Sequence, residues 1–375
     1  MTAPRRSTGE PVRANVGREV DERTLPQIVH VIPYDGIGGV ETAVASVTAG
    51  RYPGFVFRKA YVASNSRPEH RPYVFEPGIG SENNPLAFAR TIRHLVGLRP
   101  AVLVLSLWRS CIVGLAVKAL RPRTKLVVFL HNIRDSNWVD AVLTRAAAQV
   151  ADAIWADSAS TATQRLGPAW TSRARPISFL TARIERVTGG RPAPQFITWG
   201  RLHPRKRIGL ALEFFACVHA RHPDARFVII GPDRGEQPML EAKVAELGLG
   251  DAVRFVGPAD LSQIARHAAS ASFFVQTSRS EGMGMAVVEA MQLGLVPVVT
   301  PVGEIGTYVE DGRNGIWFTD AAATCDRVDR LLADPAAFGA ISEAAAGTWR
   351  GRPLYGDEFI GACTEIAAKL DVPVR

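Results

Sequence analysis

The chain has 375 residues, of which 47% are hydrophobic, 8% aromatic and 21% charged, and its formal net charge is +8. This composition excludes a largely disordered chain, and the length suggests two globular domains of roughly 150 residues or more each. No apolar stretch reaches the roughly 20 residues needed to span a bilayer. Four widely spaced cysteines form no zinc or redox motif, which indicates buried free thiols in a reducing cytosol: Cys111, Cys217, Cys325 and Cys363.

Positive charge is concentrated in the first half of the chain. From Asn83 to Arg134 there is no Asp or Glu. The cations of this segment are Arg90, Arg93, Arg99, Arg109, Lys118, Arg121, Arg123, Lys125 and Arg134. Ordinary solvated helix faces would explain them, and attraction to an anionic membrane or a phosphorylated acceptor is the alternative. No aromatic residues interleave with a basic motif, so we predict no nucleic-acid partner.

The N-terminal part of the chain predicts a tail followed by an α/β domain. Residues 1–24 lack the apolar core of a secretory signal and are expected to be a disordered tail. Short β-branched runs then alternate with segments of helical spacing, which is typical of parallel α/β units. The strands that we predict are residues 27–32, 55–63, 101–106, 125–130 and 152–156. Residues 25–188 are therefore predicted to form a first Rossmann-like domain.

The segment Thr188 to Pro194 reads Thr-Gly-Gly-Arg-Pro-Ala-Pro, which suits neither a helix nor a central strand and is predicted to link two domains. The alternation then resumes, with strands predicted at residues 195–199, 226–230, 253–256, 272–276, 296–300 and 315–318. Between the first two of these, a helix is predicted whose core stripe is Leu210, Phe214, Phe215 and Val218. We predict a second Rossmann-like domain over residues 189–350.

Residues 351–375 are predicted to form a C-terminal helix that packs back toward the first domain. The predicted fold class is α/β, with two doubly wound domains facing across a cleft. In such sheets ligands bind outside the carboxyl ends of the strands. Residues directly after predicted strands are therefore the site candidates.

Two candidates lie in the first domain. Gly38 and Gly39 follow the first strand and precede Glu41 and a helix, so their backbone could approach a phosphate closely, although a plain tight turn is the alternative. Their spacing is not the Gly-x-Gly-x-x-Gly of dinucleotide-binding oxidoreductases. His131 follows the strand at residues 125–130, where it could bond a sugar hydroxyl or take part in proton movement; a structural hydrogen bond is the alternative.

A pair of cations follows the first strand of the second domain. Arg201 and Lys206 are separated by a turn that contains Pro204, so both could reach one point. A diphosphate is the natural target, because Arg offers a planar fork of donors and Lys a point charge. The alternative for this segment is a basic loop that enters a helix.

The strongest signal is the segment from Glu281 to Glu289. An uninterrupted helix would place these carboxylates about 80° apart around its axis, so we expect Glu281 on a loop and Glu289 inside the helix. The residues between them that we expect to face a sugar nucleotide are Gly282, Met283, Gly284 and Met285. Glu281 would accept hydrogen bonds from sugar hydroxyls, the helix terminus would receive phosphate, and Glu289 would hold a ribose diol. A surface salt bridge is the alternative for Glu289.

With these motifs, the sequence resembles retaining glycosyltransferase family 4, also called glycosyl transferases group 1, which has the GT-B fold. The similarity runs from about Gln27 to Leu370. Glu281 and Glu289 match the Glu-x7-Glu motif of that family, and Arg201 with Lys206 looks like its diphosphate-binding pair. Gly38 and Gly39 look like its glycine loop, and His131 falls where the family has a histidine near the transferred sugar.

The resemblance implies a retaining, metal-independent transferase that takes a sugar from a nucleoside-diphosphate donor, with UDP or GDP as the nucleotide. Met283 and Met285 replace an aromatic residue and a leucine that are common in the family, which leaves the donor open. The first domain would bind the acceptor, a glycan, a lipid-linked saccharide or a small molecule. The predicted catalytic residues are His131, Glu281, Arg201 and Lys206. We expect no cofactor and no covalent intermediate on Glu281. We also expect no metal, because no Asp-x-Asp occurs, so the cations and helix amides would stabilise the leaving diphosphate.

Two other functions remain open: a sugar-nucleotide epimerase or hydrolase on the same fold, and a non-catalytic sugar-nucleotide-binding protein. The predicted location is the cytoplasm, with association with the inner face of the membrane as a further hypothesis.

Overall fold

The computed structural model of the protein describes residues 22, 24–36, 38–64, 71–78, 80–131, 133–187 and 190–370. The predicted tail, except Glu22 and Thr24, and the first two residues of the predicted linker lie outside this range. The chain divides into two compact units: the first runs to Arg183 and resumes at Pro353, and the second is Ile184–Arg352. The boundaries expected from the sequence, after residues 188 and 350, lie a few residues away. Each unit is described by itself.

The first unit is built on one sheet with the strand order β2-β3-β1-β5-β6-β7-β8, and β4 pairs with β3. The strand pairs are parallel, except that β2 runs antiparallel to β3. Its strands are β1 Gln27–Asp35, β2 Gly50–Tyr52, β3 Phe55–Ser64, β4 Val74–Phe75, β5 Val102–Ser106, β6 Lys125–Leu130, β7 Ala153–Ala156 and β8 Ala174–Pro176. Its helices are α1 Gly39–Ser46, α2 Pro85–Leu98, α3 Trp108–Leu120, α4 Trp138–Val150, α5 Ala159–Leu166, the 3-10 helix η1 Pro168–Arg173 and α13 Tyr355–Ala368.

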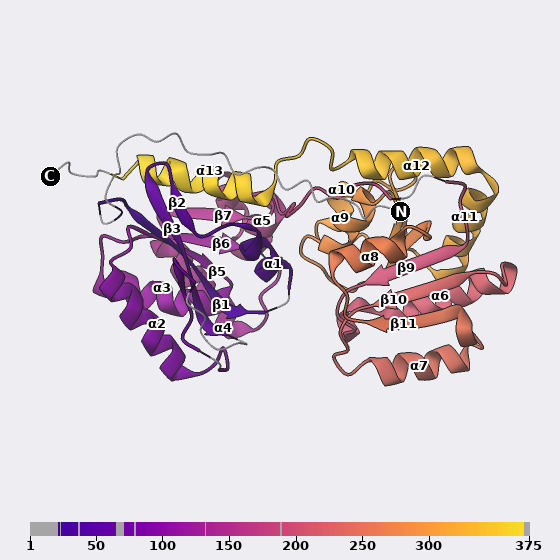
Figure 1. Cartoon of the computed structure of the whole chain (residues 1–375), viewed down its shortest axis with the longest axis horizontal. Coiled ribbons are helices and arrows are strands. Elements are labelled where there is room, and N and C mark those ends of the chain that lie inside the picture. The colour runs from indigo at the N-terminus through magenta and orange to yellow at the C-terminus, as the bar shows by residue number, and fades with distance from the viewer. Residues whose placement is uncertain are drawn as a thin grey trace. The chain divides into compact units, whose positions relative to one another are not determined.

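Helices cover both faces of this sheet (Figure 1). Alternate residues of a strand point to opposite faces. On one face, Val29, Val31 and Leu103 belong to an apolar core that also holds residues of α2, α3 and α4. On the other face, His30 stacks on Phe359 of α13, with 5.0 Å between ring centroids. The C-terminal helix thus completes the core of the first unit.

The second unit has a parallel sheet with the strand order β11-β10-β9-β12-β13-β14. Its strands are β9 Gln195–Trp199, β10 Arg226–Ile230, β11 Val253–Gly257, β12 Phe273–Gln276, β13 Val296–Val299 and β14 Ile316–Trp317. Its helices are the 3-10 helices η2 Pro204–Lys206 and η3 Gly250–Ala252, and α6 Ile208–Arg221, α7 Gln237–Glu246, α8 Leu261–Ala268, α9 Met285–Gln292, α10 Ile305–Tyr308, α11 Ala321–Ala333 and α12 Pro335–Gly347. An aromatic core joins α6 to the sheet, since Phe196 of β9 contacts Phe214 and Phe215.

The strands predicted from β-branched runs all occur, most of them shifted by one residue or none at either end. β1 is longer than predicted and continues to Asp35. β2, β4 and β8 were not predicted, because runs of two or three residues carry no periodicity. In α6 the predicted stripe faces the core, with three side chains fully buried and Leu210 packed against it. Three cysteines are buried free thiols as expected, whereas Cys217 is only half-buried.

Removal of the Phe359 ring should destabilise the first unit strongly. Phe359 is fully buried and lies against Phe57, Trp155 and Tyr355 as well as His30. Because the cavity left by a large aromatic side chain closes only in part, we expect Phe359→Ala to lower the free energy of unfolding by about 3–5 kcal/mol. Urea denaturation followed by tryptophan fluorescence measures this.

The matched control for that experiment is Leu86→Ala in α2, whose side chain is 66% exposed. It should change the free energy of unfolding by no more than about 0.5 kcal/mol. An effect of Phe359→Ala as small as that of the control would show that α13 is not part of the core.

Candidate functional site

The predicted diphosphate cations lie beside one pocket of the second unit. Arg201 follows β9, and Lys206 is the last residue of η2. Both line a small pocket at the carboxyl ends of β9 and β12, together with Trp199 and Gln276. Arg201 is exposed and Lys206 is partly buried. Neighbouring strands of a parallel sheet end at the same edge, which is why two segments far apart in sequence meet here.

Lys206 also contacts the first carboxylate of the Glu-x7-Glu motif. Its Nζ lies 2.8 Å from Oε1 of Glu281, and Oγ of Ser278 donates a hydrogen bond to the same oxygen at 2.6 Å. Oγ1 of Thr277 donates to the Arg207 carbonyl at 2.8 Å, which ties the two loops together through backbone as well as charge. The predicted cation and the predicted sugar-binding carboxylate are therefore neighbours.

Glu281 lies on the loop before α9 and Glu289 lies within that helix, as the spacing predicted. The turn into α9 requires a glycine, because Gly284 caps the helix with φ +71°. The Tyr308 hydroxyl donates to the Met283 carbonyl at 2.8 Å and so fixes the loop formed by Gly282 and Met283. The helix begins at Met285, and its first amide groups have no partner within the helix ladder.

Glu289 is bonded to Trp199, a residue that lines the pocket, and no salt bridge of Glu289 occurs among the described residues. Nε1 of Trp199, which is 5% exposed, donates a hydrogen bond to Oε2 of Glu289 at 2.7 Å. Burial raises the pKa of Glu289 above its ordinary value, and the indole hydrogen bond and the charge of Lys206 oppose that rise. The carboxylate is thus held by Trp199 at one oxygen.

A second glycine supports the loop that carries Glu281. Gly303 has φ +60°, and a Cβ on it would lie 2.1 Å from the Glu281 carbonyl oxygen. The next residue, Glu304, donates its amide to the Gly282 carbonyl at 3.0 Å. Any larger side chain at position 303 would push this loop away, which explains the glycine after β13 in physical terms.

In the first unit, the glycine segment opens α1. Gly39 is the first residue of the helix and Gly38 is its N-cap, in an extended conformation. A Cβ on Gly38 would lie 2.2 Å from Oε2 of Glu41, so the missing side chain leaves room for that carboxylate. The helix thus includes Gly39 and Glu41, which the sequence pattern placed before it.

His131 follows β6 and is 6% exposed. Its Nε2 lies 2.8 Å from Oγ of Ser106, which in turn lies 2.7 Å from Nε2 of His30. The rings of Phe129 and Phe179 pack against it at centroid distances of 4.1 and 5.3 Å. Burial, and next the charge of Arg165, lower the pKa of His131 to about 3, so the ring is neutral at physiological pH.

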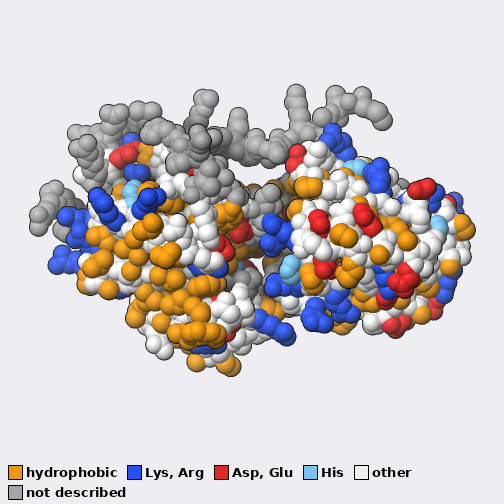
Figure 2. All heavy atoms as spheres, turned by 90° about the horizontal axis from the view of Figure 1, so that it is seen from below, with side chains coloured by type: hydrophobic (Ala, Val, Ile, Leu, Met, Phe, Trp, Pro, Cys, Tyr) orange, Lys and Arg blue, Asp and Glu red, His pale blue; other side chains and the backbone are white. Residues whose placement is uncertain are grey.

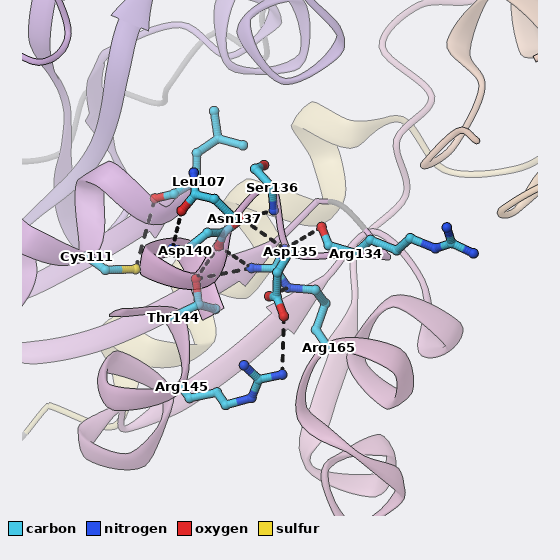
Figure 3. Close-up of polar contacts among 10 residues, drawn as sticks. All are labelled: Leu107, Cys111, Arg134, Asp135, Ser136, Asn137, Asp140, Thr144, Arg145 and Arg165. Carbon is cyan, nitrogen blue, oxygen red and sulfur yellow. Dashed lines mark hydrogen bonds and ion pairs between the residues drawn. The ribbon is translucent and has the colours of Figure 1, made fainter. Parts of the chain in front are cut away.

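A cavity of about 150 Å³ adjoins His131, and Arg165 and Asp140 help to line it. Figure 3 shows Arg165 reaching across to the loop after β6: it donates to Asp140 Oδ1 at 2.6 Å and to the Arg134 carbonyl at 2.8 Å. Its Nε lies 3.2 Å from Asp135 Oδ1. Burial acts to raise the pKa of Asp140, but the Ser136 amide and Arg165 together lower it. This buried network holds the chain that follows His131.

In the second unit, the structure places Arg201 and Lys206 along one pocket. Glu281 contacts Lys206, and Glu289 contacts Trp199, which lines the same pocket. Gly38, Gly39 and His131 lie in the first unit. Trp199, Ser278 and Ser106 were not predicted. Trp199 and Ser106 end strands that were predicted, so their positions at the ligand edge of each sheet were the available signal. No group of three or more His, Cys, Asp or Glu side chains that could hold a metal occurs among the described residues.

Comparison with known proteins gives one family match. Residues 193–334 match the family described as "Glycosyl transferases group 1". The chain is 34% identical to the D-inositol 3-phosphate glycosyltransferase of Frankia alni over 165 residues, and this aligned segment covers 40% of each chain. Over 145 residues it is 26% identical to the alpha-monoglucosyldiacylglycerol synthase of Acholeplasma laidlawii, or 39% of this chain and 36% of that one. The chain thus matches about two fifths of the length of these relatives.

The likeness in structure is more extensive than the likeness in sequence. The structure of Anabaena HepE in complex with UDP-glucose superimposes with a TM-score of 0.71, covering 91% of this chain and 99% of that one at 19% identity. At this identity the likeness shows the fold. The chain therefore has the GT-B fold, and its residues 193–334 match the glycosyl transferases group 1 family.

Proposed function

We propose that the protein is a retaining glycosyltransferase, which moves a sugar from a nucleoside-diphosphate donor, UDP or GDP, to an acceptor hydroxyl. One observation carries this proposal: Lys206 and Glu281 lie 2.8 Å apart beside the pocket that Arg201 also lines. A sugar diphosphate needs cations for its phosphates and an acceptor of hydrogen bonds for its hydroxyls, side by side. The relatives named glycosyltransferase or synthase support a transfer reaction, and HepE with its UDP-glucose supports the donor class.

In the proposed reaction the bond between the anomeric carbon and the phosphate oxygen breaks, and its electron pair leaves on the diphosphate. Arg201, Lys206 and the first amides of α9 stabilise that negative charge. Glu281 binds and orients the sugar without a covalent bond, and Glu289 holds the ribose. The acceptor oxygen bonds to the anomeric carbon on the same face, and its proton passes to the departing phosphate.

We assign His131 a hydrogen bond to a substrate hydroxyl. A ring whose pKa lies near 3 is almost never protonated to imidazolium at neutral pH and is a weak base, so we assign it hydrogen bonding in place of the proton movement considered from the sequence. The first unit would bind the acceptor, and the second the donor.

Loss of either donor-site cation should slow turnover. A helix terminus contributes about 0.3–2 kcal/mol, far less than the roughly 8 kcal/mol or more of a typical enzymatic rate enhancement, so the side chains must supply much of the stabilisation. We expect Arg201→Ala and Lys206→Ala each to lower kcat about 100-fold or more. Release of UDP or GDP from a panel of sugar nucleotides measures this, after a thermal-shift screen has chosen the donor.

The control is Arg205→Ala, because Arg205 is an exposed cation of the same 3-10 helix and does not line the pocket. It should retain near-normal kcat. Equal rates in all three variants and the unaltered protein would reject the proposed donor site.

The neutral state of His131 should also make stability depend on pH. The unfolded ring binds a proton near pH 6.5 and the folded ring only near pH 3, so stability is complete above about pH 6.5 and declines as the pH falls toward 3. We expect the free energy of unfolding to fall less between pH 7.5 and pH 5 in His131→Gln than in the unaltered protein. Urea denaturation at several pH values measures this, and His203→Gln on an exposed loop is the control. Parallel curves for all three proteins would contradict the prediction.

We further propose that helices α2, α3 and α4 bind an anionic membrane, where a lipid-linked acceptor would lie. Large apolar side chains are exposed on them, with Leu86 66%, Trp138 77% and Val142 57% exposed. Arg90 and Arg93 are exposed on α2. Figure 2 shows apolar side chains gathered on one face of the first unit, with Lys and Arg at its edge. Tryptophan and cations favour the interface of an anionic bilayer. No helix in the described ranges is long and apolar enough to cross a membrane.

Co-sedimentation with vesicles tests the membrane proposal. We expect binding to phosphatidylglycerol vesicles, little binding to phosphatidylcholine vesicles, and a reduction of about tenfold when Trp138→Ala is combined with Arg93→Ala. Met239→Ala is the control, because Met239 is an exposed apolar residue of the second unit, at 58%. Equal binding to both lipids would argue against this surface.

A further inference from the structure

Ser106 occupies an unusual place between two buried histidines. Its Oγ lies 2.7 Å from Nε2 of His30 and 2.8 Å from Nε2 of His131. All three side chains are at most 6% exposed. They come from three strands that lie next to one another in the sheet, because Ser106 ends β5, His30 lies in β1 and His131 follows β6. The sheet therefore fixes the order of the chain His30–Ser106–His131.

A hydroxyl has one proton to donate, and each neutral imidazole has one N–H and one bare nitrogen. Both rings are neutral: burial, followed by the nearby His131 and Lys59, lowers the pKa of His30 well below its ordinary value, as burial does for His131. Ser106 can then donate to only one ring and must accept from the other. The chain thus runs in one direction, and its direction decides which nitrogen of His131 carries the proton.

The surroundings of His131 favour one direction. Nδ1 is buried and has no hydrogen-bond partner among the described residues, and His131 lines the cavity that Arg165 also lines. The positive charge of Arg165 acts on this ring, since it lowers the pKa of His131. A buried N–H without a partner is rarer than a buried acceptor without one, so the unpartnered Nδ1 is the bare nitrogen.

We propose that Ser106 is a positioning residue that fixes the tautomer of His131. His131 Nε2–H donates to Ser106, and the Ser106 hydroxyl donates to His30 Nε2. Nδ1 of His131 is then left as a buried hydrogen-bond acceptor with no partner among the described residues, next to the cavity that His131 lines. Phe129 and Phe179 hold the plane of the ring, and Ser106 holds its rotation and its proton. The catalytic consequence rests on the proposed function, whereas the tautomer does not.

Two-bond proton–nitrogen NMR spectra of the 15N-labelled full chain test the tautomer directly at pH 7.5. The signals are assigned by their loss in His131→Gln and His30→Gln. We expect the proton of His131 on Nε2 and that of His30 on Nδ1. In Ser106→Ala we expect the His131 signals to move toward the average of both tautomers. A proton on Nδ1 of His131, or an unchanged His131 pattern in Ser106→Ala, would overturn the inference.

Kinetics supply the second readout, as the release of UDP from UDP-glucose or of GDP from GDP-mannose. We expect Ser106→Ala to lower kcat about tenfold with little change in KM, and Ser106→Thr, which keeps a hydroxyl, to restore most of it. Ser110→Ala is the matched control, because Ser110 is also a fully buried serine of this unit, outside the chain of three residues. It should leave both the spectrum and kcat unchanged. Equal kcat in Ser106→Ala and the unaltered protein would refute the positioning role.

The two arms separate this inference from the proposed function. If the unaltered protein turns over no sugar nucleotide, the proposed function fails, and the NMR spectra still decide the tautomer. If turnover is present and the spectra show the opposite tautomer, the inference fails while the proposed function stands.

Discussion

The ion pair of Lys206 with Glu281 is the contact on which the arrangement of the second unit's site depends. It joins the segment after β9 to the segment after β12, which are neighbours in the sheet and far apart in sequence. Both side chains are partly shielded, with 23% and 13% of their surface exposed, so their attraction is less screened than that of a surface pair. Hydrogen bonds from Ser278 and Thr277 hold the same two loops. The pair also leaves each group a short distance from where a diphosphate sugar would need it.

The first unit contains a buried ion pair near His131. Arg165 is buried with Asp140, and breaking such a pair by removing one partner typically costs about 3–5 kcal/mol. The pair therefore holds the segment after β6 in place, and it also puts the positive charge of Arg165 near His131. That charge and burial together keep the histidine neutral. The result is a neutral ring with one N–H and one bare nitrogen.

The sequence predicted the sheets and the positions of Glu281 and Glu289 because both depend on local patterns. β-branched runs of four or more residues mark buried parallel strands. Two carboxylates eight residues apart, with a glycine turn between them, favour the first on a loop and the second inside the helix. The partners of these carboxylates could not be predicted. The contacts of Trp199 with Glu289, and of Ser106 with two histidines, depend on which strands are neighbours. The order of the strands is set by the packing of the whole sheet, and no periodic pattern in the sequence near either residue reveals it.

The place of α13 has a consequence for how the chain is made. The ring of Phe359 covers His30, Phe57, Phe129 and Trp155, all of which are translated long before it. The second unit, Ile184–Arg352, is translated between the strands of the first sheet and the helix that covers them. The first unit can therefore complete its core only after the whole second unit has been translated, and until then these aromatic side chains lack the cover that α13 provides.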